Sequence, residues 1–514
     1  MGILPTRAAL RTPPPGRFAA APWHDHSPPW RELDRQLATD HLARRLDAAV
    51  DGLDLADLFA AYRGTGSHAH PPDLLLKAVL YELHSGRHRP AQWFRDAREC
   101  APLRWLLRGC QPSRTAWYAF RDRLADLDRL FNGQLLHQAA RAGLTPARRV
   151  SLDGTLVAAN ASRHRLLNEK VLGQRRAQLE QACAADADGE PSPAGPAWMA
   201  PTPRGRAVQC RRYQCAAQRM EQCQGRNARK RASKRKPRDK VLVSAADPEA
   251  ALGLDKDKVY RPLYNLQLAH DLDTPLVLGY EVLAQANDAG ALGPLLSRVR
   301  ELVGVPVALA LADAGYAGGA DLAAAAAAGV TVYAPWQAND YSAAGTKGPK
   351  QIPKEQFAWR ADEQTYRCPE GHRLEFVRQS AQKRSGAETV LLAQYRCPPE
   401  HCRVCPRRRE CTPNPEQGRT ISRGEHEDLI EALRQRMATE EAKSLYRLRR
   451  QTVELRYADV KQHRGLRRLS GRGLRRVRIE VGLTILVHNL LTLGRLRQEK
   501  AARPPARNPV LLPA

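Results

Sequence analysis

The chain has 514 residues, enough for about two to four domains, and its 43% hydrophobic content is sufficient for a packed core. A wholly disordered chain is therefore excluded. Lys and Arg number 82 against 54 Asp and Glu, which gives a formal net charge of +28. Such an excess argues against a typical small-molecule enzyme and favours a polyanionic partner, with nucleic acid as the leading candidate.

Membrane insertion and secretion are not expected. No apolar run is expected to reach the roughly 18 residues that span a bilayer. The N-terminal sequence MGILPTRAALRTPPPGR lacks the apolar segment of a secretory signal. We therefore expect a cytoplasmic, nucleoid-associated protein without a membrane partner, in which the eleven cysteines are thiols or metal ligands rather than disulfides.

The N-terminal third is expected to be helical. Residues 1–30 are Pro-rich and predict a flexible segment. Residues 31–146 show apolar residues at helical spacing and predict a DNA-binding domain of helices. Its last part, in which Ser113 or Thr115 caps a basic aromatic helix containing Arg121, favours a helix-turn-helix-like module. A domain that only packs or dimerises is the alternative.

Strands and helices alternate over residues 147–335, which predicts a layered α/β domain. The expected strands are 149–157, 264–270, 276–283, 305–313 and 330–334, and the expected helices are 291–302 and 319–328.

A basic segment interrupts this domain. Residues 176–240 predict an exposed arm or loop, and Arg226 to Lys240 contain nine Lys or Arg and a single acid. In so basic a protein this run favours phosphate contact, although a solvated face is the ordinary alternative. The cations predicted to bind DNA here are Arg229, Lys230, Arg231, Lys234, Arg235 and Lys236.

Three segments complete the chain. Residues 336–435 are rich in Pro, Gly, charge and Cys and predict an insert. Residues 436–497 predict basic helices that complete the α/β domain, the last of which is apolar enough to pack on the sheet. Residues 498–514 predict a flexible tail.

Two aspartates stand where strands of an α/β domain are expected. Asp153 lies between apolar residues of the first strand, where an acid is costly unless it is paired or binds metal. Asp313 ends the most apolar strand, and sites gather at the carboxyl ends of such strands. Carboxylates that converge there can hold divalent ions for phosphodiester chemistry, with Mg²⁺ as the expected ion. Each aspartate alone could instead be a turn or cap residue.

A third acid lies on a basic helix. At helical spacing, Tyr446, Arg450, Glu454 and Lys461 fall within an arc of roughly 80°. Between Arg447 and Arg478 there are twelve Lys or Arg and two acids. Salt bridging between Arg450 and Glu454 would explain that pair alone. A lone acid among phosphate-binding cations instead favours a metal ligand, with Arg450 and Lys461 holding DNA.

These motifs together resemble the insertion-sequence DDE transposases with a ribonuclease-H-like catalytic domain. The resemblance rests on Ser151-Leu152-Asp153-Gly154-Thr155, on Ala312-Asp313-Ala314-Gly315-Tyr316, and on Arg450-x₃-Glu454-x₆-Lys461. Asn160-Ala161-Ser162, Tyr264-Asn265 with Gln267, and the helical block from His70 to Arg121 also resemble it. The family's Tyr stands three residues before its Arg, whereas Tyr446 stands four before Arg450, and Tyr457 is an alternative.

The resemblance implies a ribonuclease-H-like mixed sheet with flanking helices and a metal site of Asp153, Asp313 and Glu454. It implies Mg²⁺ or Mn²⁺ as cofactor and terminal-inverted-repeat and target DNA as substrates. Action as a homo-oligomer is also implied. Water would free a 3′-hydroxyl, which would then attack target DNA. A non-catalytic relative that acts as a repressor, and a nuclease without strand transfer, are the alternative functions.

The insert contains a possible zinc site. Cys402-x₂-Cys405 lies near Cys411 and follows Cys368, which is usable spacing for zinc. These four thiols are the expected ligands, with Cys397 or His372 as substitutes. A set of reduced thiols without metal is the alternative.

Overall fold

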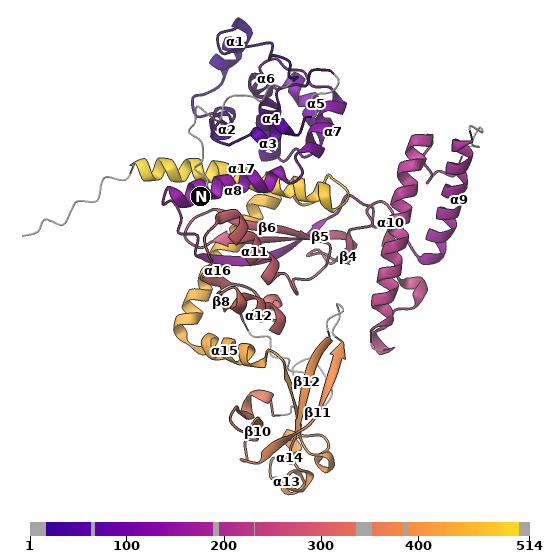
Figure 1. Cartoon of the computed structure of the whole chain (residues 1–514), viewed down its shortest axis with the longest axis vertical. Helices are drawn as coiled ribbons and strands as arrows, with labels where there is room; N and C mark the ends of the chain where they lie inside the picture. Colours follow the sequence, from indigo (N-terminus) through magenta and orange to yellow (C-terminus); the bar gives the residue numbers. More distant parts are fainter. Residues whose placement is uncertain are drawn as a thin grey trace, which may run out of the picture.

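The computed structural model describes residues 17–62, 67–188, 195–230, 232–335, 352–383 and 389–502. A helical N-terminal part lies at one end of the molecule, a mixed sheet with its helices lies in the middle, and a small β-rich insert lies at the opposite end (Figure 1). A two-helix arm projects from the side of the central part (Figure 1).

The N-terminal part is all-helical, as expected. Its helices are α1 (Pro28–Gln36), α2 (Leu42–Val50), α3 (Ala56–Ala60), α4 (Pro72–His84), α5 (Pro90–Glu99), α6 (Ala101–Leu106), α7 (Arg114–Arg123) and α8 (Leu127–Arg141). The apolar run of α4 is almost wholly buried, so this helix forms the centre of the domain. The Ser113 side chain accepts a hydrogen bond from the Ala116 amide and caps α7, which confirms the predicted cap.

Part of the segment expected to be flexible is packed. Residues 1–16 lie outside the described residues, but Phe18 pairs with Ala69 through a β-bridge. Its ring also meets the rings of Phe59 and Tyr62 edge-on, with each centroid pair 5.3 Å apart. The prediction of flexibility over 1–30 is therefore wrong for this stretch, because its aromatic side chains find partners on the helical domain.

The central sheet is mixed, which confirms the α/β class. Its strands are β1 (Arg149–Ala158), β4 (Ala251–Leu254), β5 (Tyr260–Asp271), β6 (Val277–Leu283), β7 (Leu309–Leu311) and β8 (Thr331–Tyr333). The order is β4-β5-β1-β7-β8, and β6 also pairs with β5. β5 runs antiparallel to both β1 and β6, whereas β7 and β8 continue parallel to β1. Helices α11 (Leu292–Val303) and α12 (Gly319–Ala327) lie at the expected positions.

Strand β7 is shorter than the strand predicted over 305–313. Pro306 has no amide hydrogen for the ladder. At the other end, the Asp313 side chain accepts a hydrogen bond from Gly315 and opens the short helix η4 (Ala314–Tyr316). The chain therefore leaves the sheet directly before Asp313, which places this carboxylate just beyond the strand.

The C-terminal helices are α15 (Glu427–Ala438), α16 (Glu440–Ala458), the π-helix η7 (Asp459–His463) and α17 (Leu474–Ala502). α17 is long and apolar enough to cross a membrane by length and composition, so the expectation that no such stretch exists is wrong. However, 83% of its most apolar window is buried in the protein. It packs against β6, α8 and α4 as a core helix, which agrees with the expected packing on the sheet.

The basic segment expected to be an arm or loop consists mainly of helices. These are α9 (Glu169–Ala187) and α10 (Pro203–Ala228), followed by the short η2 (Ala232–Lys234) and η3 (Arg238–Lys240), with a small β2 (Leu166–Leu167) and β3 (Val243–Ser244) pair at the base. Asn168 and Thr202 cap the two long helices with their side chains. A separate apolar cluster, which includes Leu179, Tyr213 and Met220, holds them together. The loop prediction missed these signals.

The insert is a five-stranded antiparallel sheet with short helices. Its elements are β9 (Ala358–Arg360), β10 (Thr365–Arg367), β11 (Arg373–Lys383), β12 (Thr389–Arg396), β13 (Thr420–Gly424), α13 (Pro399–Val404), α14 (Arg408–Cys411), η5 (Lys354–Gln356) and η6 (Pro415–Gln417). The strand order is β13-β12-β11-β10-β9. α15 already belongs to the central part, because Arg436 donates to the Val332 carbonyl of β8.

Candidate active site

Asp153 lies in the middle of β1, between the antiparallel β5 and the parallel β7. Its backbone pairs with Leu268 of β5, and its side chain is 17% exposed. The neighbouring Ser151 and Leu152 are fully buried. The strand therefore presents one carboxylate at a point where the rest of β1 is core.

Asp313 reaches the same edge of the sheet. β1 and β7 run parallel, with Ser151 opposite Leu311. Asp153 follows Ser151 by two positions, and Asp313 follows Leu311 by two positions. The two acids therefore lie side by side at the end of the paired strands. The structure thus brings Asp153 and Asp313 together, as the sequence motifs predicted.

A third aspartate, which the sequence analysis missed, joins them. Asp288 follows β6, and its Oδ1 accepts hydrogen bonds from the side-chain amides of Asn265 (2.8 Å) and Gln267 (2.6 Å). A Cβ added to Gly154 would lie 2.1 Å from this oxygen. The sequence held one indication, since Asn265 and Gln267 project from the same side of β5, where their amides can share an acceptor.

The three aspartates repel one another. Burial raises the pKa of Asp153 to about 6, and the charges of Asp313 and Asp288 add to this rise, while Arg449 opposes it. Burial also raises the pKa of Asp313, with Asp288 contributing in the same direction. Such a cluster favours a bound proton or cation.

Helix α16 lies across these acids through a face that differs from the predicted one. Arg449 donates from Nη2 to Asp153 Oδ1 at 2.8 Å. The Tyr457 hydroxyl donates to the Asp153 carbonyl oxygen at 2.5 Å, and Val453 is buried between them. The inward face is therefore Arg449, Val453 and Tyr457 rather than Arg450 and Glu454. Sequence phase alone could not distinguish neighbouring positions, because the packing of the helix sets which face is buried.

Glu454 is not among these contacts. Its side chain is 69% exposed and lies 3.5 Å from Arg450, itself 84% exposed. The described structure thus shows the ordinary salt bridge for this pair. Lys461, on η7, donates to the Leu156 carbonyl at 3.3 Å and so lies beside β1.

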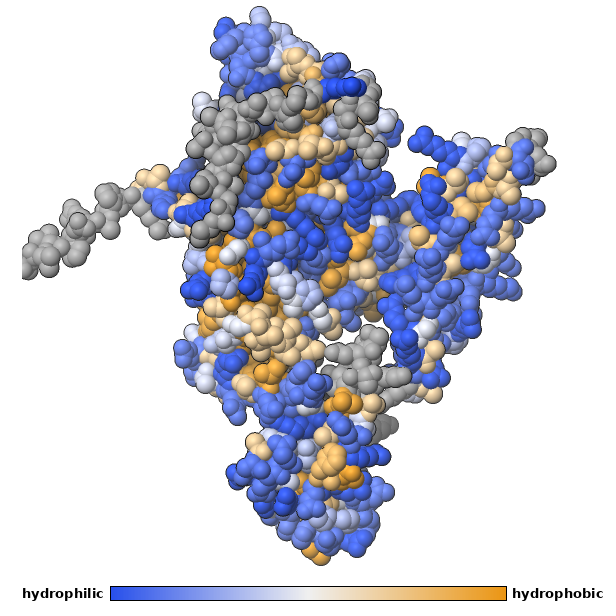
Figure 2. Space-filling view, viewed as in Figure 1, coloured by the Kyte–Doolittle hydropathy of each residue, from blue (hydrophilic) through white to orange (hydrophobic). Residues whose placement is uncertain are grey.

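The other predicted DNA-binding cations, besides Arg450 and Lys461, lie in two places. Arg121 is 12% exposed and paired with Asp122, which leaves it little freedom to contact a phosphate. The cations at the end of α10 are exposed, namely Arg229, Lys230, Lys234, Arg235 and Lys236, whereas Arg231 lies outside the described residues. Figure 2 shows that hydrophilic side chains cover much of this arm.

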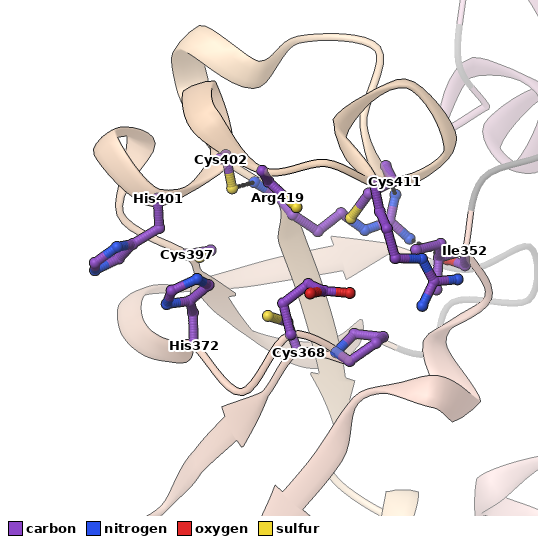
Figure 3. A pocket seen from close by; sticks show the side chains of 12 residues that line it. Ile352, Cys368, His372, Cys397, His401, Cys402, Cys411 and Arg419 are labelled. Atoms are coloured by element: carbon purple, nitrogen blue, oxygen red, sulfur yellow. Dashed lines mark hydrogen bonds between the residues drawn. The ribbon is translucent and has the colours of Figure 1, made fainter.

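The cysteines of the insert gather at one pocket. Cys368, Cys397, Cys402, Cys405 and Cys411 line it together with His372 and His401 (Figure 3). Across the described part of the chain, however, no three His, Cys, Asp or Glu side chains are arranged so that they could hold a metal ion. Neither the aspartate cluster nor the thiols of the insert have metal-binding geometry in the described residues.

Residues 367–493 match the family model of the transposase DDE domain. This segment, about a quarter of the chain, is similar to the DDE domain of transposases. The matched region runs from the end of β10 through most of α17 and so contains Glu454, Lys461 and the Cys pocket. Asp153, Asp288 and Asp313 lie outside it. No curated protein and no solved structure matches the chain.

Proposed function

We propose that this protein is a DNA transposase that binds the terminal inverted repeats of an insertion sequence and catalyses metal-dependent strand cleavage and strand transfer. One observation carries the proposal. The region that matches the transposase DDE domain includes α16, and α16 packs across β1 with Arg449 on Asp153, beside Asp313. A ribonuclease-H-like arrangement of the sheet, nucleoid localisation and action as an oligomer are parts of the same proposal.

The oxygen donors of the aspartate cluster are of the kind that binds a divalent metal, and their side chains would have to move to coordinate it. These donors are carboxylate oxygens, which hard ions such as Mg²⁺ or Mn²⁺ prefer. The mutual repulsion of Asp153, Asp313 and Asp288 is the electrostatic feature that a cation would relieve. In addition, the buried Oδ1 of Asn265 accepts no hydrogen bond from the described residues. When bound, the metal would activate the attacking oxygen and stabilise the leaving one.

The surrounding residues would position this cluster. Asn265 and Gln267 hold Asp288 through their amides, and the Tyr457 hydroxyl anchors the backbone at Asp153. Arg449 occupies the cation position beside Asp153 in the described structure. When metal enters, we expect its guanidinium to turn toward a DNA phosphate, for which its planar donors are well suited.

Glu454 remains our proposed third metal ligand, and Arg450 and Lys461 our proposed phosphate contacts. For Glu454 to reach the aspartates, α16 must present another face than the one described. Asp288 is the competing ligand, because it already lies beside Asp153. The proposal therefore depends on a comparison of these two acids.

Strand transfer of a labelled DNA duplex, taken from the ends of the element that encodes the chain, tests the function. With Mg²⁺ we expect cleaved and joined products, and with EDTA none. Asp153→Asn and Asp313→Asn should lower cleavage at least about 10³-fold, because each removes a charge that holds the metal, while DNA binding persists. Glu454→Gln should do the same if Glu454 is a ligand, and Asp288→Asn should then retain more cleavage.

The outcomes separate the alternatives. Binding to the element ends without any cleavage in Mg²⁺ or Mn²⁺ would contradict the enzyme and favour a repressor. Cleavage without joining would favour a nuclease that shares the same site. Activity in either aspartate variant close to that of the parent would remove that residue from the metal site.

A further inference from the structure

Five of the eleven cysteines come together from separate parts of the insert. Cys368 follows β10, Cys397 follows β12, Cys402 lies on α13 with Cys405 at its end, and Cys411 ends α14. None forms a disulfide. The side chains surround one small cavity, which Figure 3 shows at close range. A shared position of thiols that are so far apart in the chain is typical of a metal-binding module.

We propose that Cys368, Cys402, Cys405 and Cys411 bind one structural Zn²⁺ ion in this pocket. The two-residue spacing of Cys402 and Cys405 is that of a chelating pair. Cys411 interacts electrostatically with the other three thiols of this set. This zinc module is separate from the carboxylate chemistry, because soft sulfur and hard oxygen select different ions.

The local backbone suits this role. The Cys368 amide donates to the His372 carbonyl, and the Gly371 amide donates to the Cys368 carbonyl, which closes a tight turn around the first thiol. Gly371 has φ +82°, a conformation that favours glycine. On the other side of the pocket, the Arg419 amide donates to Cys402 Sγ at 3.5 Å, a contact that supports a thiolate ligand.

The remaining pocket residues are less suited to the ion. Cys397 is 2% exposed, the most deeply buried of the five thiols, and it interacts with Cys402, Cys368 and Cys411, which makes it the substitute ligand. The rings of His372 and His401 stack on one another at 4.3 Å. The four proposed thiols do not yet stand at metal-binding geometry. Rotation about the Cα–Cβ bonds is the adjustment that binding requires, and each Cys side chain has a choice of rotamers.

The apolar core of the insert is small, so a bound ion would contribute to the stability of this module. Among the described residues, the buried apolar cluster of this module has nine members, and three of them are Cys397, Cys402 and Cys411. A core that is so small and so rich in thiols gains little from apolar burial alone. Metal binding would then supply folding free energy, as it does in other small metal-dependent modules.

Elemental analysis of the full chain, purified under reducing conditions from cells supplied with zinc, tests the inference. We expect about one zinc per chain for the parent protein. Cys405→Ser should reduce the content to below about 0.2 per chain, because a closed four-ligand site loses affinity steeply with a ligand. Cys397→Ser is the matched control and should retain the ion, as should Asp153→Asn.

Cobalt provides a second measurement that does not depend on a variant. Replacement of zinc by Co²⁺ in the parent chain should give intense visible bands of tetrahedral geometry and thiolate charge-transfer bands in the near ultraviolet. Absence of zinc and of these bands, with the insert resistant to protease, would overturn the proposal. Retention of zinc by Cys405→Ser and its loss from Cys397→Ser would also overturn the ligand assignment. Zinc content is independent of strand transfer, so either proposal can fail without the other.

Discussion

At the scale of single residues, the candidate active site depends on the absence of a side chain at position 154. Gly154 lies directly after Asp153 on β1. A Cβ placed there would lie 2.1 Å from Asp288 Oδ1 and 2.3 Å from Gln267 Nε2. The glycine is required here by close approach, because its backbone conformation is not left-handed. The glycine therefore allows Asp288 to lie close to β1, the strand that carries Asp153.

Gly154→Ala is expected to displace Asp288 and Gln267 from Asp153. The added methyl group cannot fit beside the two polar atoms, so cleavage should fall by about 10-fold or more, in keeping with the sensitivity of catalysis to small displacements. DNA affinity should stay within about twofold, because the substitution adds no charge. Cleavage and binding assays on the same duplex give both values.

Gly173→Ala is the matched control for this substitution. Gly173 lies on α9, and an added Cβ there would meet no atom within 4 Å. Alanine also has the higher helix propensity, so this variant should be as stable as the parent or more stable. Unchanged cleavage in Gly154→Ala would mean that Asp288 can move without consequence, and would remove it from the site.

At the scale of elements, the π-helix η7 offers a reason why Glu454 faces solvent. A π-helical turn contains one residue more than an α-helical turn, and such turns occur often at functional sites. In the described structure the extra residue lies after Glu454, within Asp459–His463. If the extra residue lay instead on the N-terminal side of Glu454, the helix after it would be shifted by one position. Glu454 would then occupy the position of the buried Val453. Glu454 would then face Asp153.

Deletion of Gln462 tests this register shift. The side chain is exposed, and its loss removes the extra residue from η7. α16 and η7 would then form a continuous α-helix, which lacks the extra residue whose movement would turn Glu454 inward. We expect cleavage to fall by at least about 10³-fold, as for the loss of either aspartate ligand. Gln462→Ala keeps the extra residue and should cleave like the parent.

A deletion variant that cleaves normally would show that the described register is already the active one. Asp288 would then be the better candidate for the third ligand. Circular dichroism and DNA affinity of the deletion variant serve as its structural controls, since a loss of both would indicate misfolding instead of a fixed register. If the deletion variant misfolds, Val453→Glu combined with Glu454→Gln provides a second test of the register shift. It restores cleavage if position 453 faces the metal.

At the scale of the whole molecule, the sequence predicted the sheet better than its surroundings. The strands that carry Asp153 and Asp313 were recognisable because apolar residues isolate each acid. Asp288 was not predicted, because Asn265 and Gln267, although they belong to the quoted motif, lie on another strand, and only the folded sheet brings the aspartate to them. The sequence also could not show that Arg449, and not Arg450, contacts Asp153, because the packing of α16 determines which of its faces is buried. The helices of the arm were not predicted, because its basic residues drew attention away from the capping residues Asn168 and Thr202.

The two-helix arm projects from the body of the molecule (Figure 1), and the cations that follow α10 are exposed, so they are available to DNA. Neutralisation of the five described cations to Gln should flatten the salt dependence of DNA binding. Each phosphate contact contributes a slope of about −0.9 in log affinity against log salt, so the loss of five contacts would reduce the slope by up to about 4.5. The five positions are Arg229, Lys230, Lys234, Arg235 and Lys236. The control exchanges Lys and Arg at the same positions, which keeps the charge and should keep the slope. An unchanged slope in the neutral variant would show that the arm is merely solvated, and the DNA-binding surface would then have to be sought on the helical domain and along α16.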